Sequence, residues 1–411
     1  MPLVQSKKYP WVVVGLLWGV ALLNYLDRQM LSTMRPVMLT DIKELESATY
    51  FGYLLSVFLW IYGLVSPFSG LIADRFSKKR IIILSLFVWS AVTFLMGYAQ
   101  TFNQLFWLRA IMGFSEALYI PAGLALIASY HDSKTRSLAV GIHMTGLYMG
   151  QALGGFGSTI ATSISWQQTF QFFGLIGIIY SLVLFFFLSD SSSGHKSSTV
   201  LPTTISPFSG YRILFGSLSF IVLLFYFMIP SLPGWGIKNW LPTLFAQNLN
   251  IEMSVAGPLS TITIAISSLA GVITGGILSD KWAQVNFNGR VYTSAIGLAL
   301  TIPALYLIGV GQSIEIAIGA ALLYGFGFGM FDANNMPILC QLVPSHLRAT
   351  GYGVMNMGGV FAGAFTTYYL GKSFDAGHIN RDIIFLSLIV AAAIVLQLLF
   401  LHPKPQDQLD A

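Results

Sequence analysis

Long apolar segments fill most of this 411-residue chain and constrain its fold more than any other feature. A helix needs roughly 20 largely apolar residues to cross a membrane. Only 9% of the residues are charged, against about 25% in soluble domains. We therefore predict an all-α integral membrane protein with twelve transmembrane helices. We expect them at 10–34, 50–72, 81–99, 103–130, 137–163, 167–188, 212–246, 255–279, 290–309, 314–341, 349–372 and 380–402.

The seventh segment is too long for one straight span. Pro230, Pro233, Gly234 and Gly236 lie near its middle, and we expect them to break the helix there. Such breaks are tolerated only where the backbone packs inside protein or lines a cavity.

One long polar connection, rich in Ser and Thr, divides the chain. It predicts a six-helix bundle over 1–188, a linker over 189–211 and a second six-helix bundle over 212–411. The halves repeat one another, which is typical of membrane transport proteins. Gly70-x3-Asp74-Arg75 recurs as Gly276-x3-Asp280-Lys281, Gly113-x2-Glu116-x4-Pro121 as Gly329-x2-Asp332-x4-Pro337, and Arg136-x4-Gly141-x4-Gly146 as Arg348-x4-Gly353-x4-Gly358.

The basic residues predict the topology. Most of the 21 Lys and Arg residues lie at the termini, in the linker or in the loops on that side. Only Arg35, Lys43, Lys372 and Arg381 lie in the opposite loops. The positive-inside rule then places both termini in the cytoplasm, and we expect a multi-pass protein of the cell (inner) membrane. This pattern accounts for the net charge of +5, so we expect lipid around the chain and no nucleic-acid partner.

The loop Gly70-Leu-Ile-Ala-Asp74-Arg75-Phe-Ser77-Lys78-Lys79-Arg80 resembles the signature loop of the major facilitator superfamily, with Ser77 where the family usually has Gly. The resemblance implies two pseudo-symmetric six-helix bundles that move about a central site. It also implies that Gly70, Asp74, Arg75 and Lys79 form a cytoplasmic latch that controls this movement. A loop that merely sets the topology is the alternative.

Two further motifs resemble the anion:cation symporter family, which includes bacterial sugar-acid carriers and vesicular and lysosomal organic-anion carriers. They are Asn24-Tyr25-Leu26-Asp27-Arg28 and Arg109-x3-Gly113-x2-Glu116-Ala117-x3-Pro121-Ala122. Trp240-Leu241-Pro242 and Asn356 also fit. The resemblance implies proton-coupled import of a small organic anion such as a hexuronate or aldonate. Spinster-like carriers of lysophospholipids or sphingolipids share the first motif and the span-four Arg and Glu, and remain the alternative. A non-transporting sensor is a third hypothesis.

Charged residues within the predicted spans are functional candidates, because an ionisable group at bilayer depth is costly unless it is paired or hydrated. Asp27 and Arg28 are adjacent and point about 100° apart on a helix. Arg28 suits the substrate cavity, where its guanidinium can hold a carboxylate. Asp27 would then face a neighbouring helix and pair with Arg109. The resemblance implies a proton site at Asp27, an anion anchor at Arg28 and a partner of Asp27 at Arg109; a structural salt-bridge cluster is the alternative.

Glu116 lies two helical turns after Arg109 and shares its face of span four. Low dielectric favours the protonated form of a buried carboxyl group, and the resemblance implies a proton carrier here. A static hydrogen bond between helices is the alternative. Asp332 is the pseudo-symmetric counterpart of Glu116. Lys238 either pairs with Asp332, contacts substrate or extends to the outer surface.

His143 either shuttles protons or is hydrogen-bonded within the bundle. Neutral polar residues at membrane depth are candidates for contacts with substrate hydroxyl groups; these are Tyr25, Tyr53, Tyr148, Gln151, Asn334, Asn335 and Asn356.

The sequence contains no motif for ATP binding, metal binding or catalysis. We therefore expect a transporter rather than an enzyme, with no cofactor, driven by the proton gradient and functional as a monomer.

Overall fold

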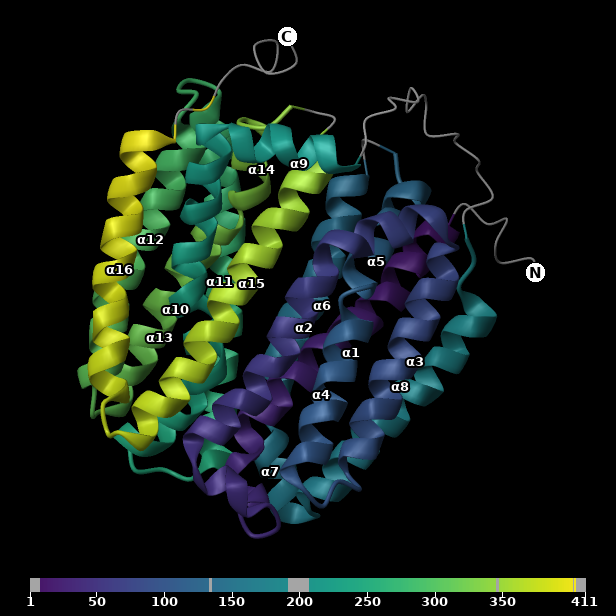
Figure 1. Cartoon of the computed structure of the whole chain (residues 1–411), viewed down its shortest axis with the longest axis vertical. Coiled ribbons are helices and arrows are strands. Elements are labelled where there is room, and N and C mark those ends of the chain that lie inside the picture. The colour runs from purple at the N-terminus through teal and green to yellow at the C-terminus, as the bar shows by residue number, and fades with distance from the viewer. Residues whose placement is uncertain (1–7, 133–134, 191–206, 345–346, 402, 404–411) are drawn as a thin grey trace.

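The computed structural model describes residues 8–132, 135–190, 207–344, 347–401 and 403 (Figure 1). These residues form helices and connecting loops, without strands. Most of the predicted linker, 191–206, lies outside the described residues. The helices are α1 (Tyr9–Met38), α2 (Ala48–Arg75), α3 (Lys78–Met96), α4 (Phe102–Glu116), α5 (Tyr119–Tyr130), α6 (Arg136–Gly154), α7 (Gly157–Ser163), α8 (Trp166–Phe187), α9 (Pro207–Gly216), α10 (Leu218–Asn248), α11 (Met253–Ala283), α12 (Gly289–Val310), α13 (Ile314–Asp332), α14 (Asn335–Cys340), α15 (Arg348–Asp375) and α16 (Ile379–Phe400), with a short 3₁₀ helix at Lys43–Glu46.

The helices match the predicted spans closely. Within the described residues, 10 are long and apolar enough to cross a membrane. The fifth predicted span (α6 and α7) and the eleventh (α15) complete the twelve. These two are rich in glycine and pack between other helices, α6 on α1 and α11, and α15 on α2 and α10. Their sequences therefore need less lipid-facing apolar surface.

The predicted break in the seventh segment is wrong. Helix α10 runs without interruption through Pro230 and Pro233, and the chain breaks earlier, at Ser217, between α9 and α10. Neighbouring side chains fill the space beside the helical glycines. A Cβ on Gly234 would lie 2.6 Å from the Phe328 ring, and one on Gly236 would lie 2.9 Å from Leu370. Close packing thus supports a helix that has lost some of its own hydrogen bonds.

Interruptions occur instead in the fourth and tenth spans, at matching places. Helix α4 ends at Glu116 and α5 begins at Tyr119; α13 ends at Asp332 and α14 begins at Asn335. A proline follows in each case, Pro121 and Pro337. Its ring lacks an N–H and clashes with the carbonyl four residues earlier, which belongs to the helix C-caps Ala117 and Ala333. The prolines therefore place each acid at a helix end.

The helices form two groups, α1–α8 and α9–α16, which lie side by side (Figure 1). The first turn of α1 and the last turn of α16 lie at one end of the molecule, and the two groups diverge towards that end. At the opposite end, which we call the closed end, α2 packs on α15 and α7 packs on α11. Gly155 and Gly257 allow the closest approach there, because a Cβ on Gly155 would lie 1.9 Å from Thr261 Oγ1.

Candidate functional site

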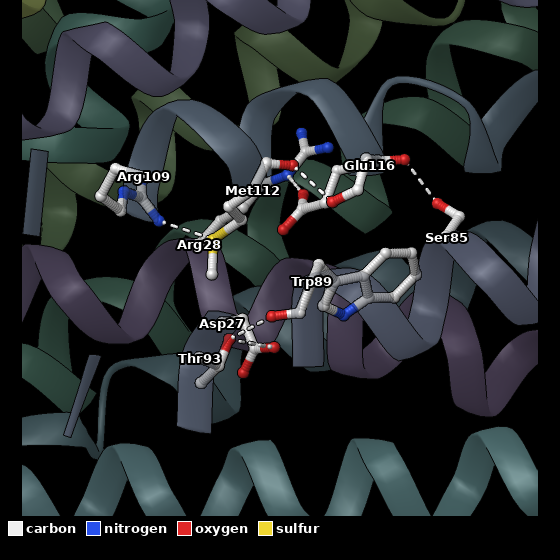
Figure 2. Close-up of polar contacts among 9 residues, drawn as sticks. Asp27, Arg28, Ser85, Trp89, Thr93, Arg109, Met112 and Glu116 are labelled. Atoms are coloured by element: carbon white, nitrogen blue, oxygen red, sulfur yellow. Dashed lines mark hydrogen bonds and ion pairs between the residues drawn. The ribbon is translucent and has the colours of Figure 1, made fainter. Parts of the chain in front are cut away.

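Arg28 of α1 and Glu116 of α4 form a buried ion pair (Figure 2). Arg28 Nε donates to Glu116 Oε2 at 2.5 Å, and the side chains are 10% and 0% exposed. Arg28 Nη2 and Glu116 Oε1 are buried without a hydrogen-bond partner among the described residues. The pair therefore neutralises both charges but leaves hydrogen-bonding capacity on each partner.

Aromatic rings surround the Arg28 guanidinium. Its Cζ lies 4.7 Å from the centre of the Tyr62 ring, 4.8 Å from Phe58 and 5.0 Å from Tyr25. These rings stabilise a cation electrostatically and exclude water from it. They also place Arg28 behind the surface of the central cavity rather than on it, which differs from the predicted orientation.

Asp27 faces α3, as expected for a residue turned away from Arg28. Its Oδ2 accepts a hydrogen bond from Thr93 at 3.2 Å. The expected ion pair with Arg109 is not formed among the described residues. Arg109 instead lies 4.7 Å from the centre of the Phe58 ring and contacts Met112 Sδ at 3.1 Å. Phe58 thus lies close to both arginines.

A cavity of about 360 Å³ lies between the two halves. Both halves line it, so a bound molecule would contact both. Seven predicted residues line it: Tyr25, Tyr148, Gln151, Lys238, Asp332, Asn335 and Asn356. Arg28 and Asn334 are not among the lining residues. Asn334 is fully buried and donates to the Met330 carbonyl at 2.8 Å, at the interruption after α13. Tyr53 lies elsewhere, where its ring contacts Tyr368 across the two halves at 4.4 Å.

Lys238 and Asp332 both face the cavity but form no direct ion pair within the described residues. Lys238 Nζ lies over the Trp235 and Phe328 rings, at 5.4 and 5.8 Å from their centres. Asp332 is exposed and accepts a hydrogen bond from Asn335 at 3.1 Å. Of the three hypotheses for Lys238, this arrangement fits the contact with substrate.

His143 is fully buried in α6. Its ring packs edge-on against Tyr119, with centroids 5.9 Å apart. Neither ring nitrogen has a hydrogen-bond partner of normal geometry among the described residues, and both hypotheses for His143 stay predictions.

The contacts that the structure describes for the predicted latch (Gly70, Asp74, Arg75 and Lys79) lie within the N-terminal half. Lys79 donates from its backbone N–H to Asp190 and from Nζ to the Phe185 carbonyl, each at 2.9 Å. Ser77 also donates to Asp190. Gly70 has open space around it, Arg75 is exposed, and the side chain of Asp74 lies outside the described residues. In this conformation Lys79 therefore fastens the loop to the end of α8.

One contact between the halves at the closed end was not predicted from the sequence. The Asp375 carboxylate, at the end of α15, accepts hydrogen bonds from the backbone N–H groups of Ala48 and Thr49 at 2.7 and 2.8 Å. The Ser47 and Thr49 hydroxyls add bonds at 2.6 and 2.7 Å. An acid at a helix N-terminus is favourable. This one comes from the other half of the chain, so no local sequence pattern reveals it.

The site also contains aromatic residues that the sequence did not predict. Tyr62 and Tyr352 line the cavity, and Phe58 packs on both arginines. Phe58 and Tyr62 are four residues apart on α2 and share one face, a weak signal that many apolar helices show. The described residues contain no group of three or more His, Cys, Asp or Glu side chains arranged to hold a metal ion.

Comparisons with known proteins agree with this architecture. The profile of the Major Facilitator Superfamily matches residues 17–367. A probable galactarate/D-glucarate transporter of Escherichia coli is 24% identical over 94% of this chain and 93% of its own length. A D-galactonate transporter, also from Escherichia coli, is 26% identical over 76% of this chain and 77% of its own. A bacterial homologue of the human lysosomal transporter Spinster, in an inward-facing and unoccupied conformation, superposes with a TM-score of 0.81 at 19% identity, covering 96% of this chain and 97% of that structure.

Proposed function

This chain belongs to the major facilitator superfamily and is a multi-pass membrane transporter rather than an enzyme, and we propose that it couples proton movement to the transport of a small organic anion. The relatives named for galactarate, glucarate and galactonate support a sugar acid as the substrate. The buried Arg28–Glu116 pair is the observation that carries the proposal, because it supplies a physical means of coupling.

The Glu116 carboxylate already binds the Arg28 guanidinium, which is the group that an incoming carboxylate would bind. The two carboxylates therefore compete for Arg28. A proton on Glu116 removes its charge and leaves Arg28 as a buried cation without a counter-ion, a state that is strongly unfavourable. An anion from the cavity restores neutrality. Protonation thus favours anion binding, and by linkage anion binding favours protonation.

Asp27 provides a second proton site in this proposal. It lies on the same helix as Arg28 and is 3% exposed. A lone carboxylate at that depth is costly, whereas a protonated one is not. Its contact with Thr93, whose hydroxyl can donate or accept, suits either protonation state.

The contacts between the halves support alternating access as the transport mechanism. With both termini in the cytoplasm, as the basic loops predict, the closed end faces outward and this conformation faces inward. A rocking movement that separates α2 from α15 and α7 from α11 would expose the cavity to the other side. We place the protein in the inner membrane, working as a monomer on the energy of the proton gradient.

A lipid carrier of the spinster type is the competing hypothesis. The structural similarity supports only a shared fold at 19% identity. The cavity is near the lower end of the usual range for small-molecule sites, about 300–1,000 Å³. Its lining includes Lys238, Gln151 and Asn356, whose polar groups suit a hydroxylated anion better than acyl chains.

Uptake into proteoliposomes tests the proposal. Labelled glucuronate, gluconate, galactarate and sialic acid are supplied with and without an inward proton gradient, to the wild type and to Glu116→Gln. We expect the gradient to drive accumulation in the wild type. Glu116→Gln mimics the protonated acid, so it should still exchange labelled for unlabelled substrate, but with one of the two proposed proton sites lost the gradient should drive far less accumulation than in the wild type.

Glu315→Gln is the matched control, since Glu315 is an exposed acid in the first turn of α13. It should behave as the wild type does. Accumulation by Glu116→Gln that follows the gradient as strongly as in the wild type would contradict coupling at Glu116. Failure of every sugar acid in a folded wild-type protein would favour the lipid carrier, and lysolipid flux would then be measured.

A further inference from the structure

The C-terminal half contributes its own cation and acid to the cavity. Lys238 Nζ has neither a hydrogen bond nor an ion pair within the described residues, although it lies among aromatic rings. Asp332 is exposed to the same cavity. A cation in this position lacks a strong partner within the described residues.

These two residues repeat the arrangement of Arg28 and Glu116. Lys238 follows Arg28 by 210 residues and Asp332 follows Glu116 by 216, which fits the spacing of the repeated motifs. Arg28 lies ten residues before the end of α1, and Lys238 lies ten residues before the end of α10. Each acid is the last residue of its helix. The duplication has therefore produced two half-sites of the same composition.

The two half-sites meet where the halves touch. Gln29, next to Arg28, donates from Nε2 to the Lys238 carbonyl at 3.0 Å. Tyr25, whose ring covers Arg28, lines the cavity together with Lys238. A molecule in this cavity therefore has a cation on each side: Lys238, which is half-buried and lines the cavity, and Arg28, which lies behind aromatic rings.

We infer that Lys238 and Asp332 form a second anion half-site, and that the substrate is a dicarboxylate whose two ends bind Lys238 and Arg28. The inference rests on the proposed function. A cation at membrane depth is stabilised by a counter-charge, and a monocarboxylate would supply one to only one of the two cations once Glu116 is neutral. A dicarboxylate satisfies both. Asp332 competes with the substrate for Lys238, as Glu116 does for Arg28, and so permits release.

Glucarate and gluconate provide the test, since both have a six-carbon hydroxylated chain and they differ at one terminal carboxylate. Their affinities are compared by competition against uptake of labelled glucarate in proteoliposomes. We expect the wild type to prefer glucarate by roughly 10- to 100-fold, the usual worth of a charge-assisted hydrogen bond. Lys238→Met should abolish most of this preference, and Lys238→Arg should retain it.

Asp332→Asn should act in the opposite direction. A neutral amide no longer competes for Lys238, so we expect the preference for glucarate to rise and glucarate release to slow. A variant that merely disturbs the shape of the cavity would lower the affinity for both ligands, so a change in the preference between them indicates an electrostatic effect. The decisive result is therefore that the preference for glucarate over gluconate falls in Lys238→Met and rises in Asp332→Asn.

Three outcomes would overturn the inference. One is a folded wild type that takes up both ligands in response to the proton gradient with equal affinity; the proposed function would then stand without the second half-site. Another is an equal loss of both ligands in Lys238→Met. The third is a folded wild type that takes up neither ligand, which would remove the proposed function and the inference together.

Discussion

The two halves of the molecule contain the same pair of charges in different states. In the N-terminal half, Arg28 and Glu116 are in direct contact and almost excluded from solvent. In the C-terminal half, Lys238 and Asp332 face the cavity without direct contact within the described residues. A buried pair is held together because separating its members exposes each to a large desolvation penalty. Separating a pair that is in contact with water costs much less free energy, because water solvates each charge.

The difference assigns the halves different tasks. In the proposed mechanism, a proton or an anion breaks the N-terminal pair, so that pair is suited to coupling. The C-terminal cation lines the cavity, so it is suited to meeting the substrate first. In that mechanism the proton-dependent step follows the initial encounter.

Removing Arg28 should cause the largest change in folding stability at either charge pair. Arg28→Met leaves Glu116 buried without its partner, which typically costs about 3–5 kcal/mol in folding stability. We expect a large fall in thermal stability, measured for purified protein in detergent. The double variant Arg28→Met/Glu116→Gln removes both charges and should recover most of the loss without restoring transport. Equal stability of Arg28→Met and the wild type would show that the Arg28–Glu116 ion pair does not stabilise the fold.

A second difference between the halves is the glycine break in the fifth span. Helix α6 stops near Gly155, whereas its counterpart α15 is continuous. A Cβ at Gly155 would collide with Thr261 of α11 at the closed end. Gly155→Ala should therefore disfavour closure there by about 1–3 kcal/mol, the usual cost of overpacking.

Labelling of a single cysteine measures this closure. Ser260→Cys is introduced in a Cys340→Ser background, because Ser260 is buried in α11 near the contact. A membrane-impermeant maleimide added from the outside should react faster in Gly155→Ala. Gly141→Ala lies on the same α6 helix with nothing within 4 Å of the new Cβ, and should leave the rate unchanged. Equal rates in both variants would argue against a tight crossing at Gly155.

The spans were predictable because hydropathy and length act over whole helices. All twelve predicted segments correspond to helices or to helix pairs. The break in the seventh segment was misplaced because proline signals are weaker than packing inside a bundle. Pro121 and Pro337 caused real interruptions, and their matched positions in the repeat were a signal that could have revealed them.

The site was predictable in composition but not in geometry. The motif around Arg28 and Glu116 brought the correct residue types together, and the structure pairs them. The partner of Asp27 is Thr93, and the ring beside Arg109 is that of Phe58; both come from other helices. The bond from Asp375 to α2 joins residues more than 300 positions apart. Contacts of this kind depend on how helices pack, which no local spacing encodes.

The smallest expected effect is the stability change at the C-terminal pair. Lys238→Met and Asp332→Asn should each alter folding stability by no more than about 1 kcal/mol, because water in the cavity solvates the remaining charge. Thermal unfolding in detergent, run beside Arg28→Met, gives the comparison directly. A loss of folding stability in Lys238→Met as large as that in Arg28→Met would mean that the two charge pairs contribute equally to the fold. Lys238 would then act as a structural cation, and the division of tasks between the halves would fail.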